Sequence, residues 1–445
     1  MIKTQVCIIG AGAGGIGCAY RLIKNGIKTV VVDKNADFGG TMVFSGVDGW
    51  EPGVTLDGLH QLLYDEMSKI ENGCHIVRQV PGEHLFTLEG AEGWNGEYDL
   101  KKLPWAVALR SEYKYSDTYK RTPYRFSKRL QFEPSAMIKA VDNIFKPYKE
   151  NLNTFFGFRY LSCETQNEKI TGVTITDGIN KEKICADIFV DATGDIVFAR
   201  DAGCKYAIGT EGKEDYNEPS ARTKTELVNG ATFVFRIRKV PDNNHIDQIP
   251  PEYYVVDIED YKNNRIKNIV SYIVEYPNGD FNVNMLPTMQ GNEYLSLDDN
   301  AEKVGRAMVW AYWNYLQKEK NMKGFSLIHI YDAGIRESYR LVGKYVLKEQ
   351  DLRAGILKQP KIGRTIAIAD HAMDVHGEGG MCKELTMPYE IPIECAMANE
   401  FDNLFVSSKA ASFTHIAASS VRLSRTMISM GEGVGEYIAE KIKSL

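Results

Sequence analysis

The first forty residues carry the clearest pattern of apolar and polar positions in the chain. An apolar run at residues 4–9 predicts a buried strand, and the glycine-rich stretch 10–15 follows it directly. Apolar residues then recur at i, i+3, i+4 and i+7, which predicts a helix from about 14 to 25. A second apolar run, 28–32, ends in Asp33. Strand, glycine turn, helix, strand and acid follow in the order that a dinucleotide-binding unit requires.

Each part of this unit has a physical role. Gly10 permits the tight turn, and Gly12, without a Cβ, lets the backbone approach a pyrophosphate. Gly15 lets the helix pack closely on the strand, and the helix N-terminus offers free N–H groups to phosphate. Asp33 is placed to accept hydrogen bonds from the ribose hydroxyls of an adenosine. We therefore expect the chemistry of this protein to depend on a bound dinucleotide.

The rest of the chain contains regions of two kinds. Some have the strands and helices typical of a nucleotide-binding domain, and one is mainly β. Helices are predicted at about 133–149, 298–318 and 425–443, and strands at 154–161, 169–176, 182–186, 188–191, 231–240, 253–258, 268–275, 281–286 and 403–407. We therefore expect an α/β nucleotide domain built from residues 1–204, with an insertion at about 54–130, and from residues 333–445. A mainly β (α+β) substrate domain, 205–332, would be inserted between its two parts.

Composition excludes some classes of protein. The chain has 445 residues, 44% hydrophobic and 25% charged, which is typical of a globular protein. A net charge of −6 argues against bulk nucleic-acid binding, and no apolar run reaches the length of a membrane span. The eight cysteines are dispersed without a C-x-x-C motif, and the first strand leaves no room for a signal peptide. We expect a cytoplasmic protein with no bound metal and no membrane contact.

One local stretch departs from this acidic average. Residues 101–129 carry nine basic residues against two acids, with tyrosines interleaved. Basic residues with aromatics can bind nucleic acid. A solvated loop, or a lid over an anionic substrate, is the alternative that the short run and acidic chain favour.

These pieces together resemble the FAD-dependent oxidoreductases with a glutathione-reductase-like nucleotide fold. The resemblance rests on five blocks in order: residues 10–15 with Asp33; Gly39-Gly40-Thr41; Val190-Asp-Ala-Thr-Gly194-Asp195; Gly334-Ile-Arg-Glu-Ser338; and Thr414-His415 through Ser420-Val-Arg422 to Gly431-Glu-Gly-Val-Gly435. It implies an FAD-binding, Rossmann-like, three-layer domain.

By this resemblance, the cofactor contacts come from four of the blocks. The implied FAD-binding residues are Gly10, Gly12, Ala13, Gly14, Gly15, Asp33, Lys34, Gly39, Gly40, Thr41, Ala192, Thr193, Gly194, Arg422, Leu423 and Arg425. The chain has Ser408-Lys409 where the family usually has Gly-Arg, and Arg425 where a proline often opens the last helix. Asp33 stands where flavoproteins more often carry glutamate, which leaves a site for NAD alone open.

A flavin needs from the protein mainly orientation, electrostatics and one group that takes a proton as hydride leaves. We expect His376 to be this base, because Asp374, two residues earlier on an extended loop, would face the same way and orient it. Arg336 would bind an anionic part of the substrate, and His415 is the second candidate base. Two other interpretations stay open: a metal site of His371, Asp374, His376 and Glu378, or a purely structural histidine.

The sequence thus predicts an FAD-dependent oxidoreductase, a dehydrogenase or oxidase, that transfers hydride between FAD and a small polar substrate, hydroxylated or carboxylated. The electron acceptor stays open. A flavin-dependent RNA-modifying protein that uses the basic stretch, and a nonenzymatic flavin-binding protein, are the alternatives.

Overall fold

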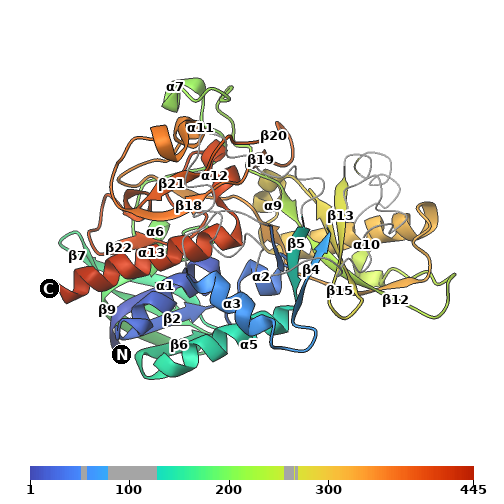
Figure 1. Cartoon of the computed structure of the whole chain (residues 1–445), viewed down its shortest axis with the longest axis horizontal. Helices are drawn as coiled ribbons and strands as arrows, with labels where there is room; N and C mark the ends of the chain where they lie inside the picture. Colours follow the sequence, from blue (N-terminus) through green and yellow to red (C-terminus); the bar gives the residue numbers. More distant parts are fainter. Residues whose placement is uncertain (52–57, 79–127, 255–264, 266–268, 445) are drawn as a thin grey trace.

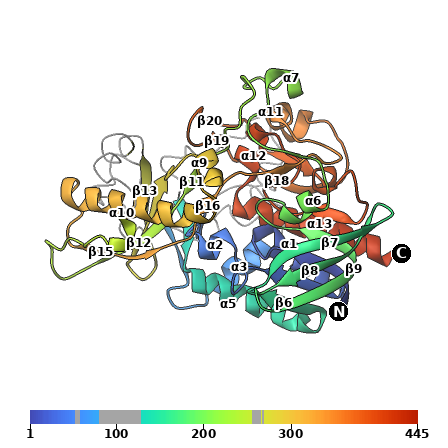
Figure 2. The same ribbon diagram turned by 180° about the vertical axis from the view of Figure 1, so that it is seen from behind.

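The computed structural model describes residues 1–51, 58–78, 128–254, 265 and 269–444. Two hydrophobic cores organise these residues, one around a seven-stranded sheet and one around a four-stranded sheet. Figures 1 and 2 show the four-stranded sheet with helix α10 at one end of the molecule, and both chain termini at the other. The architecture is the expected one: a Rossmann-like α/β domain with a β-rich partner.

The seven-stranded sheet contains the first unit of the chain at its centre. Its order is β6-β2-β1-β9-β8-β7, and β22 pairs with β9. β1, β2, β6, β9 and β22 run parallel, whereas β7 and β8 are antiparallel to their neighbours. Parallel strands are buried on both faces, which explains their continuous apolar runs. The strands are β1 Ile2–Ile9, β2 Thr29–Asp33, β6 Leu152–Phe156, β7 Arg159–Gln166, β8 Lys169–Thr176, β9 Lys181–Asp191 and β22 Leu404–Val406.

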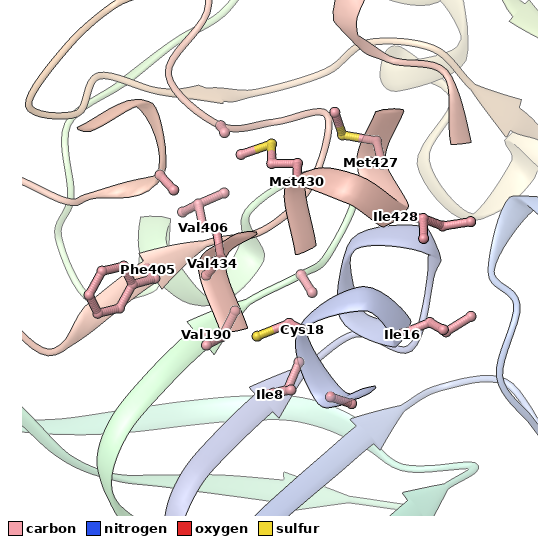
Figure 3. Packing of buried hydrophobic residues seen from close by; sticks show 14 of the residues in the cluster. Ile8, Ile16, Cys18, Val190, Phe405, Val406, Met427, Ile428, Met430 and Val434 are labelled. Carbon is pink, nitrogen blue, oxygen red and sulfur yellow. The ribbon is translucent and has the colours of Figure 1, made fainter. Parts of the chain in front are cut away.

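Two helices from opposite ends of the sequence lie together on this sheet (Figure 3). Helix α1 (Ala13–Lys24) directs its predicted apolar stripe into the core, and α13 (Ser424–Lys443) packs against it. A Cβ at Gly431 would overlap the carbonyl oxygen of Gly14, and one at Gly17 would overlap that of Ile428. Glycines therefore bring the two helix backbones into contact, and α13 remains one continuous helix despite its three glycines.

The second core lies between a sheet and one long helix. The antiparallel sheet has the order β13-β14-β12-β15, and α10 (Ala301–Glu319) packs its Trp313 and Tyr312 against it. The Trp313 and Phe235 rings meet at 5.9 Å between centroids. The strands are β12 Val234–Lys239, β13 Val270–Glu275, β14 Phe281–Leu286 and β15 Phe325–Ile330.

The part of the molecule built on the seven-stranded sheet is called the first body, and the part built on the four-stranded sheet the second body. The remaining elements are mostly short. On the N-terminal side they are α2 Thr41–Phe44, β3 Gly49–Trp50, α3 Leu59–Met67, β4 Cys74–Arg78, β5 Lys128–Phe132, α5 Pro134–Phe145, η4 Lys146–Asn151, α6 Val197–Asp201, β10 Tyr206–Ala207, α7 Lys213–Tyr216, β11 Ala231–Thr232 and η5 Pro251–Tyr253. On the C-terminal side they are α9 Gly291–Ser296, η7 Asp298–Asn300, β16 Gly334–Ile335, β17 Arg340–Leu341, α11 Glu349–Lys358, β18 Thr365–Ala369, β19 Met373–Val375, β20 Met381–Lys383, β21 Tyr389–Pro392, η8 Ile393–Ala396 and α12 His415–Val421.

Several predicted boundaries differ from the structure. The strand predicted at 154–161 is two strands, because Gly157 takes a positive φ of 76° and turns the chain between β6 and β7. The strands predicted at 182–186 and 188–191 are one strand, β9, long enough to pair with β8 at one end and β22 at the other. Of the strand predicted at 253–258, Tyr253 ends a 3₁₀ turn and 255–258 lie outside the described residues. Most of the basic stretch, 101–127, also lies outside them.

A buried polar network joins the two bodies. Asp48, fully buried, accepts hydrogen bonds from Gln131 Nε2 at 2.6 Å, Asn282 Nδ2 at 2.9 Å and the Tyr276 hydroxyl. The Tyr276 hydroxyl also meets that of Tyr331 at 2.8 Å. Asp48 and Gln131 belong to the first body, whereas the other three side chains come from the second.

No helix among the described residues is both long and apolar enough to cross a membrane.

Candidate functional site

The glycine turn after β1 is shaped by its close contact with the end of β9. The Gly10 N–H donates to the Val32 carbonyl at 2.7 Å, and Gly10 has a φ of 109°, where a side chain would be strained. A Cβ there would also lie 2.6 Å from the Ala192 carbonyl carbon. At Gly15, a Cβ would overlap the Gly10 carbonyl oxygen. The turn is thus held against two strands by residues that have no room for side chains.

The opposite side of the turn is open. Gly12 and Ala13 are half-exposed, and a Cβ at Gly12 would meet only the Gly40 Cα, at 3.9 Å. No side chain caps the first turn of α1, and no acid lies in that turn. The N–H groups and the positive dipole end of α1 therefore face a space that can accept phosphate. This cradle, with the half-exposed Gly40 and the exposed Thr41 beside it, fits the pyrophosphate of a dinucleotide.

Besides its expected role at a ribose, Asp33 has a structural role that the sequence pattern did not indicate. Its Oδ2 accepts the Ala11 N–H at 2.6 Å, and its Oδ1 accepts the Asn35 N–H at 2.8 Å. Burial raises the pKa of this carboxyl. Each carboxylate oxygen still has a lone pair for another donor, such as a ribose hydroxyl. Asp33 therefore braces the glycine turn, while Lys34 is exposed.

The segment after β9 forms the other wall of this region. Thr193 is bound to Asp191, whose Oδ1 accepts the threonine N–H at 2.9 Å and its hydroxyl at 2.6 Å. The carbonyl of the exposed Gly194 accepts hydrogen bonds from Ser338 Oγ at 3.0 Å and Lys409 Nζ at 2.9 Å. Burial lowers the pKa of Lys409 to about 8.

Asp374 and His376 are within hydrogen-bond distance, with Nε2 of the imidazole 2.7 Å from Oδ2 of the carboxylate. Arg422 Nη2 lies 3.3 Å from the same oxygen. Burial alone would raise the pKa of Asp374, but the hydrogen bond from His376 and the nearby cations hold it well below its usual range. Burial lowers the pKa of His376, and Arg336 adds to this against the opposing effect of Asp374. The imidazole is therefore neutral at neutral pH.

Arg336 lies beside this pair. Its Nη1 donates to the Gly230 carbonyl at 2.9 Å and to the Thr232 hydroxyl. The Gly230 N–H in turn donates to the His376 carbonyl at 2.9 Å. Arg336 and the pair of Asp374 and His376, which lie almost forty residues apart in the sequence, are thus brought together over the start of β11.

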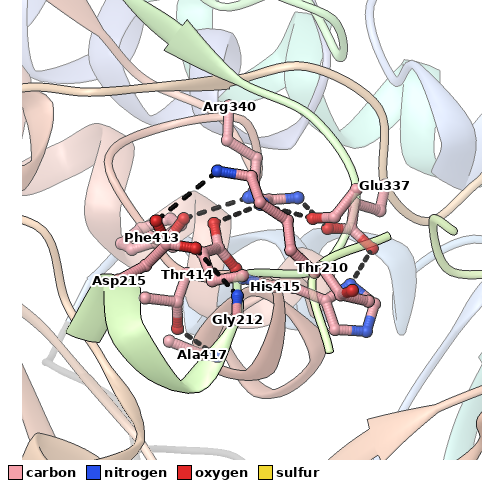
Figure 4. Close-up of polar contacts among 12 residues, drawn as sticks. Thr210, Gly212, Asp215, Glu337, Arg340, Phe413, Thr414, His415 and Ala417 are labelled. Carbon is pink, nitrogen blue, oxygen red and sulfur yellow. Dashed lines mark hydrogen bonds and ion pairs between the residues drawn. The ribbon is translucent and has the colours of Figure 1, made fainter. Parts of the chain in front are cut away.

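His415 occupies a different environment (Figure 4). Its Nδ1 lies 2.8 Å from Glu337 Oε2, and Glu337 also pairs with Arg340, which reaches Glu211 at 2.6 Å. The His415 side chain is 9% exposed, against 23% for His376. His415 and Arg340 hold the pKa of Glu337 below its ordinary value despite burial. His415 is therefore part of a buried network that holds α12.

The remaining candidates lie near the start of α13. Leu423 is the N-cap residue of this helix, and the buried Arg425 pairs with Asp370 at 2.6 Å. His371 Nε2 lies 3.6 Å from Glu51 Oε2, and its charge also contributes to the lowered pKa of Asp374. Among the described residues, no three His, Cys, Asp or Glu side chains are placed to hold a metal ion.

Asn229 was missed by the sequence analysis. Its carboxamide binds the backbone of residues 374 and 376, and its N–H binds Glu337. The only local signal was the pair Asn229-Gly230, which is typical of a turn. Its hydrogen-bond partners lie more than a hundred residues away, so no local pattern could have identified them.

Comparisons with known proteins place the chain in a family. A stretch of 82 residues is 38% identical to the glutamate synthase (NADPH) small chain of Halomonas elongata, covering 18% of this chain and 17% of that protein. Another of 81 residues is 32% identical to the thiamine thiazole synthase of Sulfolobus acidocaldarius, covering 17% and 29%. The chain thus spans less than a third of either relative.

The fold is shared more widely. The structure of a geranylgeranyl bacteriochlorophyll reductase-like protein from Thermoplasma acidophilum aligns with a TM-score of 0.50 and 12% identity, covering all of this chain and 80% of that one. At this identity the likeness concerns the fold alone. The family model described as FAD dependent oxidoreductase matches residues 5–444. The chain therefore belongs to the FAD dependent oxidoreductase family and is an enzyme whose cofactor is FAD.

Proposed function

We propose that this enzyme oxidises a small polar substrate with an anionic group, with His376 as the base that accepts the proton. The observation that carries the proposal is the 2.7 Å pair of His376 and Asp374, with Arg336 beside it at the start of β11. A neutral histidine held by a carboxylate is suited to proton transfer near neutral pH.

The cofactor would be held by the residues around the glycine turn. The turn residues Gly10, Gly12, Ala13, Gly14 and Gly15 would bind the pyrophosphate, with the ribose on Asp33. The neighbouring segments would contribute Lys34, Gly39, Gly40, Thr41, Ala192, Thr193, Gly194, Arg422, Leu423 and Arg425. The uncapped N-terminus of α1 and the open space at Gly12 support this assignment. When bound, FAD supplies the hydride acceptor.

The pair with Asp374 defines which nitrogen of His376 acts. In a neutral imidazole one ring nitrogen carries the proton and the other holds a lone pair. With Nε2–H donated to Asp374 Oδ2, Nδ1 is the basic nitrogen that takes the substrate proton. The imidazolium that forms is then stabilised by the charge of Asp374.

Three cationic groups favour an anionic substrate. Arg336 and Arg422 both depress the pKa of His376, so both charges lie close to it. The charge of Arg422 likewise lowers the pKa of Lys409, the third cationic group. Asp374 offsets part of this charge. A carboxylate on the substrate would be held by the arginines, whose planar fork matches it.

The experiment is an anaerobic screen that follows bleaching of the oxidised FAD absorbance. Pairs of compounds that differ only in a carboxylate, such as hydroxy acids and the matching alcohols, should separate, with the acids reducing the flavin faster. Arg336→Ala should raise the substrate concentration needed for half-maximal rate, whereas Arg238→Ala, in the second body and paired with Asp280, should not. Equal reduction by acids and alcohols would contradict an anionic substrate.

A further inference from the structure

Asn229, two residues before β11, makes a specific contact with the segment that carries His376. Asn229 is 1% exposed. Its Oδ1 accepts the His376 backbone N–H at 3.0 Å, and its Nδ2 donates to the Asp374 carbonyl at 3.2 Å. The Gly230 N–H adds a third hydrogen bond, to the His376 carbonyl at 2.9 Å. The carboxamide thus makes with the backbone at 374–376 the pair of hydrogen bonds that a neighbouring β-strand would make.

This segment is a short strand whose backbone has few strand partners. Among the described residues, β19 is three residues long and pairs with the equally short β20, and Gly377 and Gly379 follow it with positive φ. The Arg422 guanidinium also reaches the Asp374 carbonyl, at 3.2 Å. Asn229 therefore provides two of the hydrogen bonds that hold the pair of Asp374 and His376 on the first body against the start of β11.

The backbone of Asn229 has a separate partner. Its N–H donates at 2.8 Å to Glu337 Oε2, the oxygen that also binds His415 Nδ1. A change of the side chain leaves this N–H in place. The effect of the carboxamide on His376 can therefore be separated from the network of His415.

We propose that Asn229 is a positioning residue whose carboxamide fixes the backbone at 374–376 and so holds His376 beside Arg336. The catalytic importance of this position rests on the proposed function. Without the carboxamide, the His376 N–H loses its partner and the Asp374 carbonyl keeps only Arg422, so the segment would open to water rather than leave the N–H unsatisfied.

The test is an NMR titration of the FAD-loaded protein labelled with ¹³C-histidine, with His376 assigned by its loss in His376→Gln. Asn229→Leu keeps the size of the side chain and removes both hydrogen bonds. Asn403→Leu is the matched control, because the buried Asn403 also pairs a carboxamide with one backbone, that of Ile170, at 3.1 and 2.8 Å. Asn403 lies beside β22, away from His376.

In the wild type, His376 should titrate below the ordinary histidine value of about 6.5. In Asn229→Leu the midpoint should rise towards that value, as the imidazole becomes hydrated and moves from Arg336 and Arg422. It should stay unchanged in Asn403→Leu, and the resonances of His415 should stay unchanged in both. An unchanged His376 midpoint in Asn229→Leu would overturn the proposal.

If Asn229→Leu does not fold, Asn229→Ser, in which water can enter beside the hydroxyl, carries the same expectation. The titration needs no substrate. It would therefore succeed or fail independently of whether His376 is the base, which flavin reduction by His376→Ala decides.

Discussion

At the scale of single residues, the pKa of His376 is set by opposing influences on its imidazole. Burial and the charges of Arg336 and Arg422 disfavour its protonated form, whereas Asp374 at 2.7 Å favours it. The net result is a lowered pKa, so the group is ready to accept a proton at neutral pH.

Asp374→Asn tests this balance. The amide has nearly the same shape but no charge, so the opposition to burial is lost and the pKa of His376 should fall further. Titration of the labelled histidine by NMR measures the change, and Asp177→Asn, in an exposed turn, is the control. A midpoint that stays or rises would mean that Asp374 does not stabilise the imidazolium.

Gly12→Asp tests the cradle at the N-terminus of α1. The added carboxylate would project into the open side of the turn, where it would meet the negative charge of the pyrophosphate. The purified variant should fold but contain little or no FAD, measured by absorbance and by the flavin released on denaturation. Full flavin content would show that the dinucleotide binds elsewhere.

Sequence reasoning reached this site only in part. The placement of Asp374 two residues before His376 predicted that both side chains face the same way, and their location on β19 and just after it produces that arrangement. Asn229 and Thr232 could not be predicted, because each lies more than a hundred residues along the chain from its partner, His376 or Arg336.

At the scale of elements, the contact of α1 with α13 positions the glycine turn. Gly431 lies against the Gly14 carbonyl, so any shift of α13 displaces the first turn of α1. Gly433, on the same helix, lies instead against Ile366 of β18. Substitutions at these two glycines can therefore distinguish an effect on stability alone from an effect on cofactor binding.

We expect Gly431→Ala and Gly433→Ala both to lower the free energy of unfolding, by about 1–3 kcal/mol, because each added methyl overlaps neighbouring atoms. Only Gly431→Ala should also weaken FAD binding, measured as the dissociation constant of the reconstituted apoprotein. Equal dissociation constants for the two variants would contradict a role for this helix contact in binding.

The sequence predicted the long helices and most strands of the two main sheets, but not the short elements between them or how neighbouring strands are divided. The periodicity of α10 was strong because its buried residues recur at helical spacing, whereas α1 is buried on nearly every side and was found from its larger apolar side chains. The break at Gly157 and the continuity of β9 depend on pairing with β2, β8 and β22, which are not local in sequence. Such boundaries follow from the sheet rather than from residue preference.

At the scale of the whole molecule, Asp48 and its hydrogen-bond partners connect the two bodies at a buried interface. Burial raises the pKa of Asp48 to about 7, whereas an aspartate in an unfolded chain titrates near 3.9. Between these values the folded chain holds a proton that the unfolded chain has released. The contribution of Asp48 to the free energy of unfolding therefore falls as pH rises from about 4 to about 7.

Asp48→Asn removes this dependence. The amide oxygen can accept from Gln131 and Asn282, and the amide N–H can donate to Tyr276. The stability of the variant relative to the wild type should increase by about 3 kcal/mol between pH 4 and pH 7, measured by urea unfolding. A difference that does not change with pH would show that Asp48 does not titrate on its own in this interval.

The most direct test of the account is the rate of FAD reduction in a single turnover, followed by stopped flow without oxygen, using a substrate identified by the screen. His376→Ala should keep its FAD and reduce it at least about a hundredfold more slowly, because a matched base contributes 10²–10⁴-fold. His415→Ala, assayed alongside, should reduce its flavin far faster than His376→Ala. Wild-type reduction by His376→Ala together with failure of His415→Ala would contradict the account and place the base on α12.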